Sequence, residues 1–442
     1  MLIRNTAPAI HPLKCRKFDF PEPIVLPNGI ELWSISGGCA DICRVSLFTP
    51  GGELGENKPL VGILTALMLY KGHSDSTSFD ISEQFDYNGA FHSSNTFKDY
   101  TENSFCCLNK NFAPILRLFA DCISTPTFPA KELSNLKSRL VSSLKVSKKN
   151  TSFLATAEMR KLCYGPKHPL GAQVSVSGIK SITRADLAAF HNEFYAPEGS
   201  KLIVSGNVSN DIFDLVTNAF GQLKPRSADS HANECSCAPF SPSTTMLSVV
   251  NCKDAVQSSI KIRIPTIGSA DANFCKLQVL VTALGGYFGS RLNKVIREDR
   301  GLTYGIGATL SGCKGDSYVE IQTDCDVAYT SQVIGAVEEE ISKLKAELIP
   351  AEELECVKQF MTSRLIGQLD SPFKIASHIG RTIIDDSPKE NYNSLIDAVA
   401  ATTAPELQDI AQRHLNFSNA RIVVACDKTK QTGYKNHRFH FE

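Results

Sequence analysis

The spacing of apolar residues changes along the chain between the two-residue period of strands and the longer period of helices. Strands are expected where short apolar or alternating runs lie between turn residues; these are residues 24–32, 42–48, 101–108, 258–264 and 318–323. Helices are expected where apolar residues recur every three or four positions; these are residues 60–70, 111–122, 131–145, 274–284 and 330–348. Strands and helices segregate instead of alternating strictly, which favours an α+β fold.

The chain repeats its own pattern after about 220 residues. The segments 128–133 (FPAKEL) and 349–354 (IPAEEL) both place proline and acid at a helix start, and they lie 221 positions apart. Two further pairs lie 220 positions apart: the helix starts 183–187 and 403–407, and the apolar strands 202–205 and 422–425. A shared offset in three segments predicts two tandem copies of one domain.

Composition places the boundary between the copies. Residues 225–244 are rich in Ser, Pro, Ala and Asn and have no apolar period, as is typical of a linker. We therefore expect an N-terminal domain over 15–224 and a C-terminal domain over 245–435.

Charge and cysteine content exclude some classes of protein. Lys+Arg and Asp+Glu both number 46, so the basic footprint of a nucleic-acid-binding protein is missing. No apolar run is long enough to span a membrane, and no signal peptide is recognisable at the N-terminus, so the expected location is cytoplasmic. The 15 cysteines are scattered without metal-site spacing, which favours free and mostly buried thiols over disulfides or a zinc site.

Three stretches of the sequence carry a resemblance to a known family. They are GILTALMLYKG at 62–72, GAFHSSNTFKDYT at 89–101, and LGGYFGSRL at 284–292 followed by IREDRGLTY at 296–304. They resemble the pitrilysin/insulinase family of metallopeptidases, which includes the mitochondrial processing peptidases. Together with the duplication, the resemblance spans essentially the whole chain. It implies two tandem homologous domains, each a mainly antiparallel sheet with helices packed on it.

Active members of that family carry an inverted zinc motif, H-x-x-E-H, in the first of these stretches. Its two histidines bind zinc from one face of a helix, and its glutamate activates the zinc-bound water. Aligned on the Lys-Gly that ends the stretch, the motif positions fall on Ile63, Ala66 and Leu67, and the distant third ligand falls on Ser143. The resemblance therefore implies that the chain holds no metal. Because Ile63, Ala66 and Leu67 form an apolar i, i+3, i+4 stripe, we expect them to refill the former ligand pocket as packed core.

The second half keeps a pair of residues that active members use. In those members an arginine and a tyrosine seven positions apart help to hold the substrate carbonyl and the developing oxyanion. Arg297 and Tyr304 have this spacing. The alternative interpretation is structural, with Arg297 paired to Glu298 or Asp299 and Tyr304 packed on an edge strand.

The peptide-gripping stretch is altered. Ser93 and Ser94 stand where active members often carry Asn-Ala. A serine hydroxyl at position 93 has less reach than the asparagine amide, so substrate binding by these two residues is weakened. The strand itself can still accept an extended peptide by edge addition.

Two classes of function follow from the resemblance. In the first, the chain is the non-catalytic subunit of a heterodimeric peptidase and lends Arg297 and Tyr304 to the zinc site of a related partner with an intact H-x-x-E-H motif. Zinc is then the partner's cofactor, and the chain alone hydrolyses no peptide. In the second, the chain is a structural or peptide-binding pseudoenzyme that pairs with itself. Hydrolysis by another nucleophile has little support, because no G-x-S-x-G motif occurs.

Overall fold

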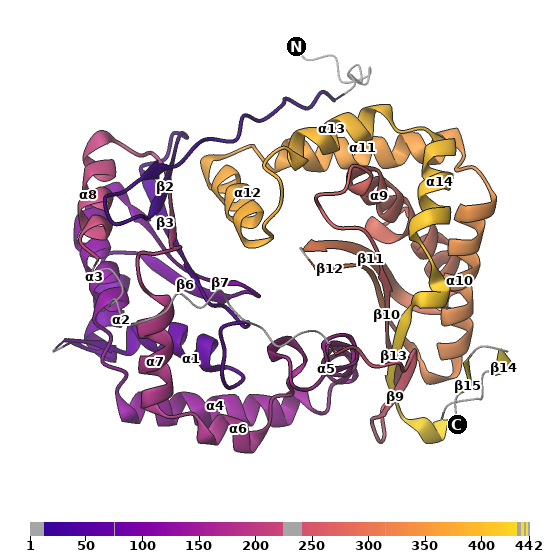
Figure 1. Cartoon of the computed structure of the whole chain (residues 1–442), viewed down its shortest axis with the longest axis horizontal. Helices are drawn as coiled ribbons and strands as arrows, with labels where there is room; N and C mark the ends of the chain where they lie inside the picture. Colours follow the sequence, from indigo (N-terminus) through magenta and orange to yellow (C-terminus); the bar gives the residue numbers. More distant parts are fainter. Residues whose placement is uncertain are drawn as a thin grey trace, which may run out of the picture.

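A computed structural model of the chain divides into two halves, each built around one sheet (Figure 1). The structure describes residues 13–74, 76–223, 241–313, 315–430, 435–436 and 439–440. Most of the expected linker, residues 225–240, lies outside the described residues. The two sheets face one another across the middle of the molecule, and most of the helices lie outside them.

The first half contains a six-stranded sheet of order β1-β2-β8-β3-β7-β6. Its strands are β1 (Ile24–Val25), β2 (Glu31–Ser36), β3 (Ile42–Pro50), β6 (Phe91–Thr96), β7 (Tyr100–Leu108) and β8 (Lys201–Gly206), and the short pair β4 (Gly72–His73) and β5 (Ser76–Thr77) stands apart. Its helices are α1 (Val61–Met68), α2 (Ser78–Tyr87), α3 (Phe112–Ser124), α4 (Ala130–Ser147), α5 (Thr151–Tyr164), α6 (Val176–Ser181), α7 (Arg184–Phe194) and α8 (Asn210–Gly221). Only β2 and β8 pair in parallel, so the expected mainly antiparallel sheet is confirmed.

The second half contains a five-stranded sheet of order β11-β12-β10-β13-β9. Its strands are β9 (Leu247–Asn251), β10 (Gln257–Pro265), β11 (Thr303–Cys313), β12 (Asp316–Asp326) and β13 (Arg421–Cys426), followed by the pair β14 (Lys435–Asn436) and β15 (Phe439–His440). Its α-helices are α9 (Phe274–Val281), α10 (Thr330–Ala346), α11 (Ala351–Gly367), α12 (Pro372–Ile384), α13 (Asn391–Ala401) and α14 (Ala404–His414), and two π-helical segments are η4 (Thr282–Gly286) and η5 (Asn293–Asp299). Short 3₁₀ turns complete the chain: η1 (Leu69–Lys71), η2 (Asn109–Asn111), η3 (Pro169–Gly171), η6 (Val327–Tyr329), η7 (Phe417–Asn419) and η8 (Lys428–Lys430).

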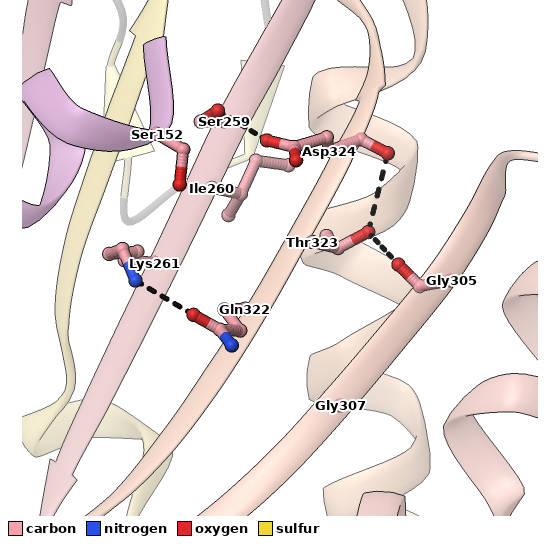
Figure 2. Close-up of a pocket in the computed structure, with 9 residues that line it drawn as sticks. All are labelled: Ser152, Ser259, Ile260, Lys261, Gly305, Gly307, Gln322, Thr323 and Asp324. Atoms are coloured by element: carbon pink, nitrogen blue, oxygen red, sulfur yellow. Dashed lines mark hydrogen bonds between the residues drawn. The ribbon is translucent and has the colours of Figure 1, made fainter. Parts of the chain in front are cut away.

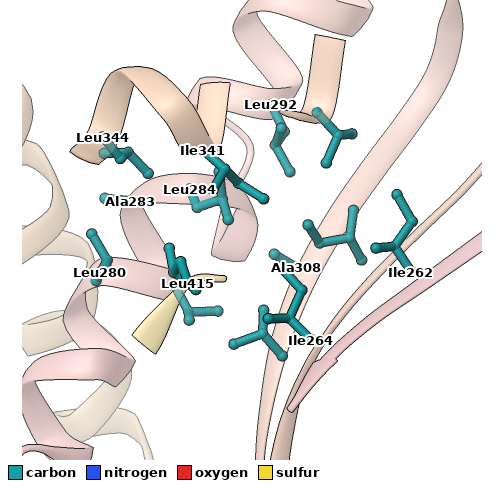
Figure 3. Packing of buried hydrophobic residues seen from close by; sticks show 14 of the residues in the cluster. Ile262, Ile264, Leu280, Ala283, Leu284, Leu292, Ala308, Ile341, Leu344 and Leu415 are labelled. Carbon is teal, nitrogen blue, oxygen red and sulfur yellow. The ribbon is translucent and has the colours of Figure 1, made fainter. Parts of the chain in front are cut away.

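The expected α+β architecture in two related copies is confirmed by matching elements. Helix α4 and helix α11 begin 221 residues apart, at Ala130 and Ala351, and strands β8 and β13 begin 220 residues apart. In both copies, successive side chains of a strand point to opposite faces of the sheet. In β10, for example, Ile262 and Ile264 point into the core beneath the outer helices (Figure 3), and Ile260 belongs to the same buried cluster. Each half thus has its own apolar core between its sheet and its outer helices.

The two halves exchange one helix each. Helix α12 of the second half packs Ala376 and Ile379 against Phe48 and Ile203 on the first sheet. In the same way, helix α5 of the first half packs its apolar face, including Met159, against β13 of the second sheet. Figure 1 shows α5 beside β10 and β13, and α12 on the side of the first sheet that faces the second half. The exchanged helices each cover part of the inner face of the other half's sheet. The candidate site lies on these inner faces.

Among the described residues, no helix combines the length and the apolar character needed to cross a membrane. The described cysteines are free thiols, and all but Cys39 and Cys356 are buried or half-buried. The expectation of free and mostly buried thiols is confirmed for these residues.

Candidate functional site

Helix α1 carries the positions that the resemblance assigns to the zinc motif, and the half-buried carboxylate of Glu56 fixes its start. Glu56 accepts hydrogen bonds from the backbone nitrogens of Leu60, at 2.8 Å, and Gly62, at 2.9 Å. These donors belong to the first turn, where backbone N–H groups have no partner within the helix. Leu60 adopts a left-handed conformation with φ of 75° at the N-cap, which the bonds to Glu56 help to hold. An acid three residues before Pro59 in the sequence is the signal that could have revealed this cap.

The motif side chains on α1 do not form the packed core that their spacing predicts. Ala66 is buried, but Ile63 is half-buried and Leu67 is 37% exposed. The face of α1 that enters the core instead carries Val61, Leu64, Thr65 and Met68. The expectation of a refilled pocket is therefore wrong for Leu67 and only partly right for Ile63. Apolar spacing identifies a helix face, but it does not show whether that face meets the core or an open surface.

The position of the third metal ligand lies on a different helix. Ser143 is exposed near the end of α4, on a helix that contacts α1. Hydrocarbon side chains at positions 63, 66 and 67 have no lone pair to give to zinc, and a lone serine hydroxyl is not among its usual protein ligands. The side chains present do not fit the family's metal site. Within the described residues, no group of three or more His, Cys, Asp or Glu side chains is arranged to hold a metal ion.

Strand β6 lies at the free edge of the first sheet, next to α1. The Ser94 hydroxyl donates to Asn103 Oδ1 at 2.7 Å and lies 3.5 Å from the carbonyl oxygen of Ala66, while the Ser93 hydroxyl lies 2.9 Å from that of Ser104. Both hydroxyls are thus engaged within the chain. The outward edge of β6 is open, since its backbone bonds within the described residues go to β7. Phe91 is 78% exposed on this strand, beside a hollow of about 440 Å³ that also reaches Arg44 and Phe373.

The corner between η5 and β11 presents the retained pair in the second half. A backbone bond from Leu302 N to Ile296 O, at 2.9 Å, and a side-chain bond from Asn293 Nδ2 to Ile306 O, at 2.9 Å, hold the corner closed. Tyr304 is 92% exposed on β11, which is the edge strand of its sheet. The corner therefore holds Arg297 and Tyr304 on either side of one tight connection.

Arg297 is held mainly by an aromatic ring. Its guanidinium carbon lies 4.3 Å from the ring centre of Phe288, whereas its nitrogen is 3.8 Å from the Glu298 carboxylate. The Nη1 atom is shielded from solvent and has no hydrogen-bond acceptor. The ion pair is long and partly exposed, so it adds little. Of the structural interpretation, the Arg297–Glu298 pair and the edge-strand position of Tyr304 are both observed, but the Tyr304 side chain is almost fully exposed and not packed.

A polar hollow of about 290 Å³ lies on the inner face of the second sheet and is lined by Gly305, the residue that follows Tyr304 in β11 (Figure 2). One side of the hollow is formed by Gly305 and Gly307 of β11, which have no side chains. A Cβ at Gly305 would stand in open space. On the other side Lys261 Nζ donates to Gln322 Oε1 at 2.8 Å, and Ser259 donates to Asp324. No sequence pattern predicts this hollow, because its polar residues alternate with core residues on strands whose partners are distant in sequence.

Comparison with known proteins identifies the family. The sequence profile described as "Insulinase (Peptidase family M16)" matches residues 34–164, and the one described as "Peptidase M16 inactive domain" matches residues 181–361. An uncharacterized zinc protease of Mycobacterium leprae is 22% identical over 412 residues, covering 92% of each chain. The human mitochondrial-processing peptidase subunit beta is 22% identical over 424 residues, covering 92% of this chain and 84% of the human one.

Solved structures agree on the fold. The crystal structure of a peptidase M16 inactive domain from Pseudomonas fluorescens superimposes with a TM-score of 0.81 and 23% identity, covering 93% of this chain and 99% of that one. Fold, duplication and both sequence profiles point to the same class, a two-domain protein of the metallopeptidase type. The chain belongs to the insulinase family of peptidases, family M16, as the sequence motifs indicated.

The cap on α1 predicts a pH dependence of stability. Burial raises the pKa of the Glu56 carboxyl to about 7, against hydrogen bonds from the backbone that lower it. Between the ordinary value of 4.5 and about 7, the folded chain binds a proton that the unfolded chain has lost. The contribution of Glu56 to the free energy of unfolding should therefore be largest below pH 4.5, fall as the pH rises to about 7, and stay constant above that.

This prediction is checked by urea unfolding of the wild-type chain and of Glu56→Gln across that pH range. The variant cannot titrate at position 56, so the difference in unfolding free energy, wild type minus variant, should decline with rising pH. A difference that stays flat, or that grows with pH, contradicts the raised pKa. The loss of one acceptor in the variant adds only a pH-independent offset.

Proposed function

We propose that the chain is the non-catalytic subunit of a two-chain peptidase, in which Arg297 and Tyr304 complete the zinc site of a related partner. The observation that carries this proposal is the exposure of Tyr304, 92% on an edge strand, next to an arginine held by Phe288. An aromatic hydroxyl that packs on nothing in its own chain is free to meet a substrate held elsewhere. The motif positions on α1, by contrast, carry no metal-binding side chain.

The chemistry assigned to this chain is electrostatic. The partner's zinc would supply the activated water, and the partner would carry the intact H-x-x-E-H motif. Arg297 and Tyr304 would donate hydrogen bonds to the carbonyl oxygen of the peptide as negative charge develops there. Support comes from the family, in which the human relative is named as a subunit. Peptides are the substrates in this proposal, zinc belongs to the partner, and neither nucleic acid nor a membrane takes part; a cytoplasmic location fits it.

Association with the partner is the first test. The chain is mixed with a family member that carries H-x-x-E-H, and the mass of the particle is measured by light scattering. We expect one particle containing one copy of each chain, formed equally well by the wild type and by Tyr304→Phe, which keeps the ring. A chain that stays alone, or that pairs only with itself in the presence of the candidate partner, would count against the proposal.

A second candidate function rests on the open edge of β6. This edge runs beside the exposed Leu67 and Phe91, so an extended peptide added to it would meet apolar side chains where active members hold zinc. The chain would then be a peptide-binding pseudoenzyme. Thr96 pairs with Thr101 at a position where its backbone N–H points away from β7, so Thr96→Pro removes a donor from the open edge and interrupts such pairing. Loss of peptide binding by this variant, with no effect of Arg297→Ala, would favour the second function over the first.

A further inference from the structure

The outer side of the first half carries a groove between helix α4 and the α6–α7 turn. It encloses about 720 Å³. Its walls are residues of one stripe of α4 (Ala130, Leu133, Ser134, Lys137, Ser138, Val141 and Ser142) and residues of the turn (Lys180, Ile182, Thr183 and Arg184). Figure 1 shows α4 and α6 along the lower rim of the molecule, outside the space that the two sheets face. The groove is therefore separate from the candidate site on the inner faces.

This groove lies in a strongly cationic part of a neutral chain. Residues 131–149 include six cationic side chains (Lys131, Lys137, Arg139, Lys145, Lys148 and Lys149) and a single acidic one, Glu132. Lys180 and Arg184 on the turn add two more. Within the part of the chain that the structure describes, none of these eight cations forms an ion pair. Their positive charge is therefore available to attract a negatively charged ligand from outside the chain.

The acceptor groups at the α6–α7 turn are already engaged within the chain. Lys137 Nζ donates to the carbonyl oxygens of Lys180 and Ile182, both at 2.6 Å, so these acceptors at the end of α6 are used internally. Asp186, in the first turn of α7, is paired with Lys58 at 2.8 Å. The Lys137 bonds also tie α4 to the turn, which sets the width of the groove.

The lining of the groove decides the kind of ligand. Leu133 and Ile182 are buried and Val141 is half-buried, so they form an apolar floor. Ser134, Ser138 and Ser142 stand along α4 with hydroxyls that bond to no other described residue. No aromatic ring lines the groove, so it lacks the stacking platform that single-stranded nucleic acid uses. A concave shape with an apolar floor suits a protein segment better than a flat membrane surface.

The length of the groove sets the length of the segment. Residues 130–142 of α4 span about 18 Å at about 1.5 Å per helical residue. That distance corresponds to about five residues of an extended chain. We propose that this groove binds a short acidic segment of a partner protein, with carboxylates against Lys180 and Arg184 and apolar side chains on the floor at Leu133 and Val141. The proposal is independent of the assignment of Arg297 and Tyr304.

The test measures fluorescence anisotropy of a labelled peptide of about eight residues, alternating Glu and Leu, with the full chain. The matched peptide carries Gln in place of Glu. We expect the Glu peptide to bind, to weaken with added salt, and to bind about tenfold more weakly to Lys180→Glu/Arg184→Glu. The control variant Lys110→Glu/Lys253→Glu makes the same charge change at exposed positions outside the groove and should bind like the wild type.

Several outcomes would overturn the proposal. Equal binding of the Gln peptide would show that charge is not recognised, and equal weakening in both variants would show a non-specific field effect. Absence of binding by the Glu peptide would remove the proposal outright. Phosphatidylserine vesicles and a single-stranded oligonucleotide serve as competitors; binding of either through Lys180 and Arg184, without binding of the Glu peptide, would assign the groove to that ligand instead.

Discussion

Turnover by the assembled pair is expected to fall about a hundredfold when Arg297 is replaced by Ala, because one donor to the developing oxyanion is lost. Tyr304→Phe removes only the hydroxyl and should lower kcat by a comparable factor. Neither change should affect folding, since Tyr304 packs on nothing and the Arg297 ion pair is long. Steady-state hydrolysis of a fluorogenic peptide by the pair gives both values.

The control is a second tyrosine of the same half. Tyr329 is 42% exposed in η6, and Tyr329→Phe should leave kcat unchanged. Arg297→Lys keeps the charge but loses the planar fork, so we expect an intermediate rate. Wild-type rates for both Arg297→Ala and Tyr304→Phe would contradict the assignment of these residues to the partner's site.

The second large effect concerns the exchanged helices. Ile379→Ala should lower the free energy of unfolding by about 2–5 kcal/mol, the usual cost of removing a fully buried aliphatic side chain. Ile379 belongs to the second half in sequence, but it is buried against the first sheet, among Phe48 and Ile203. The loss should therefore appear in the first half. Urea unfolding gives the free energy, and hydrogen exchange of β3 and β8 shows where the protection is lost.

Ile366→Ala is the matched control, because Ile366 is 37% exposed on α11 and the same atoms are removed. It should cost far less, and it should leave exchange in β3 and β8 unchanged. Since each half covers the other's sheet, we also expect a single unfolding transition for the chain. Two separate transitions, with Ile379→Ala shifting only the one that reports on the second half, would contradict the role given to α12.

The sequence predicts those parts of the fold whose pattern is strong and local. Helices α3 and α4 and strands β3 and β10 lie within a few residues of their expected bounds, because each has a clear apolar period and recognisable ends. The apolar pattern did not predict the edge strand β6, since its sequence FHSSNT is polar and mostly exposed, and only the family resemblance indicated a strand there. An edge strand needs no apolar alternation, because its order comes from the neighbouring strand.

The helix exchange could not be predicted for a different reason. Helices α5 and α12 have apolar faces, but an apolar face does not say which sheet it will cover. The same limit applies to α1 at the candidate site. The family motif assigns Leu67 to a ligand position, yet the exposure of Leu67 depends on the helix orientation that Glu56 and the packing of Leu64 impose. Residue identity was readable from the sequence, and residue environment was not.

Peptide hydrolysis during a titration of this chain into a fixed amount of the zinc-bearing partner tests the central claim most directly. We predict that the chain alone is inactive, and that activity rises with added chain and levels off at one copy per partner. Hydrolysis by the pure chain, or partner activity that does not respond to its addition, would contradict the claim.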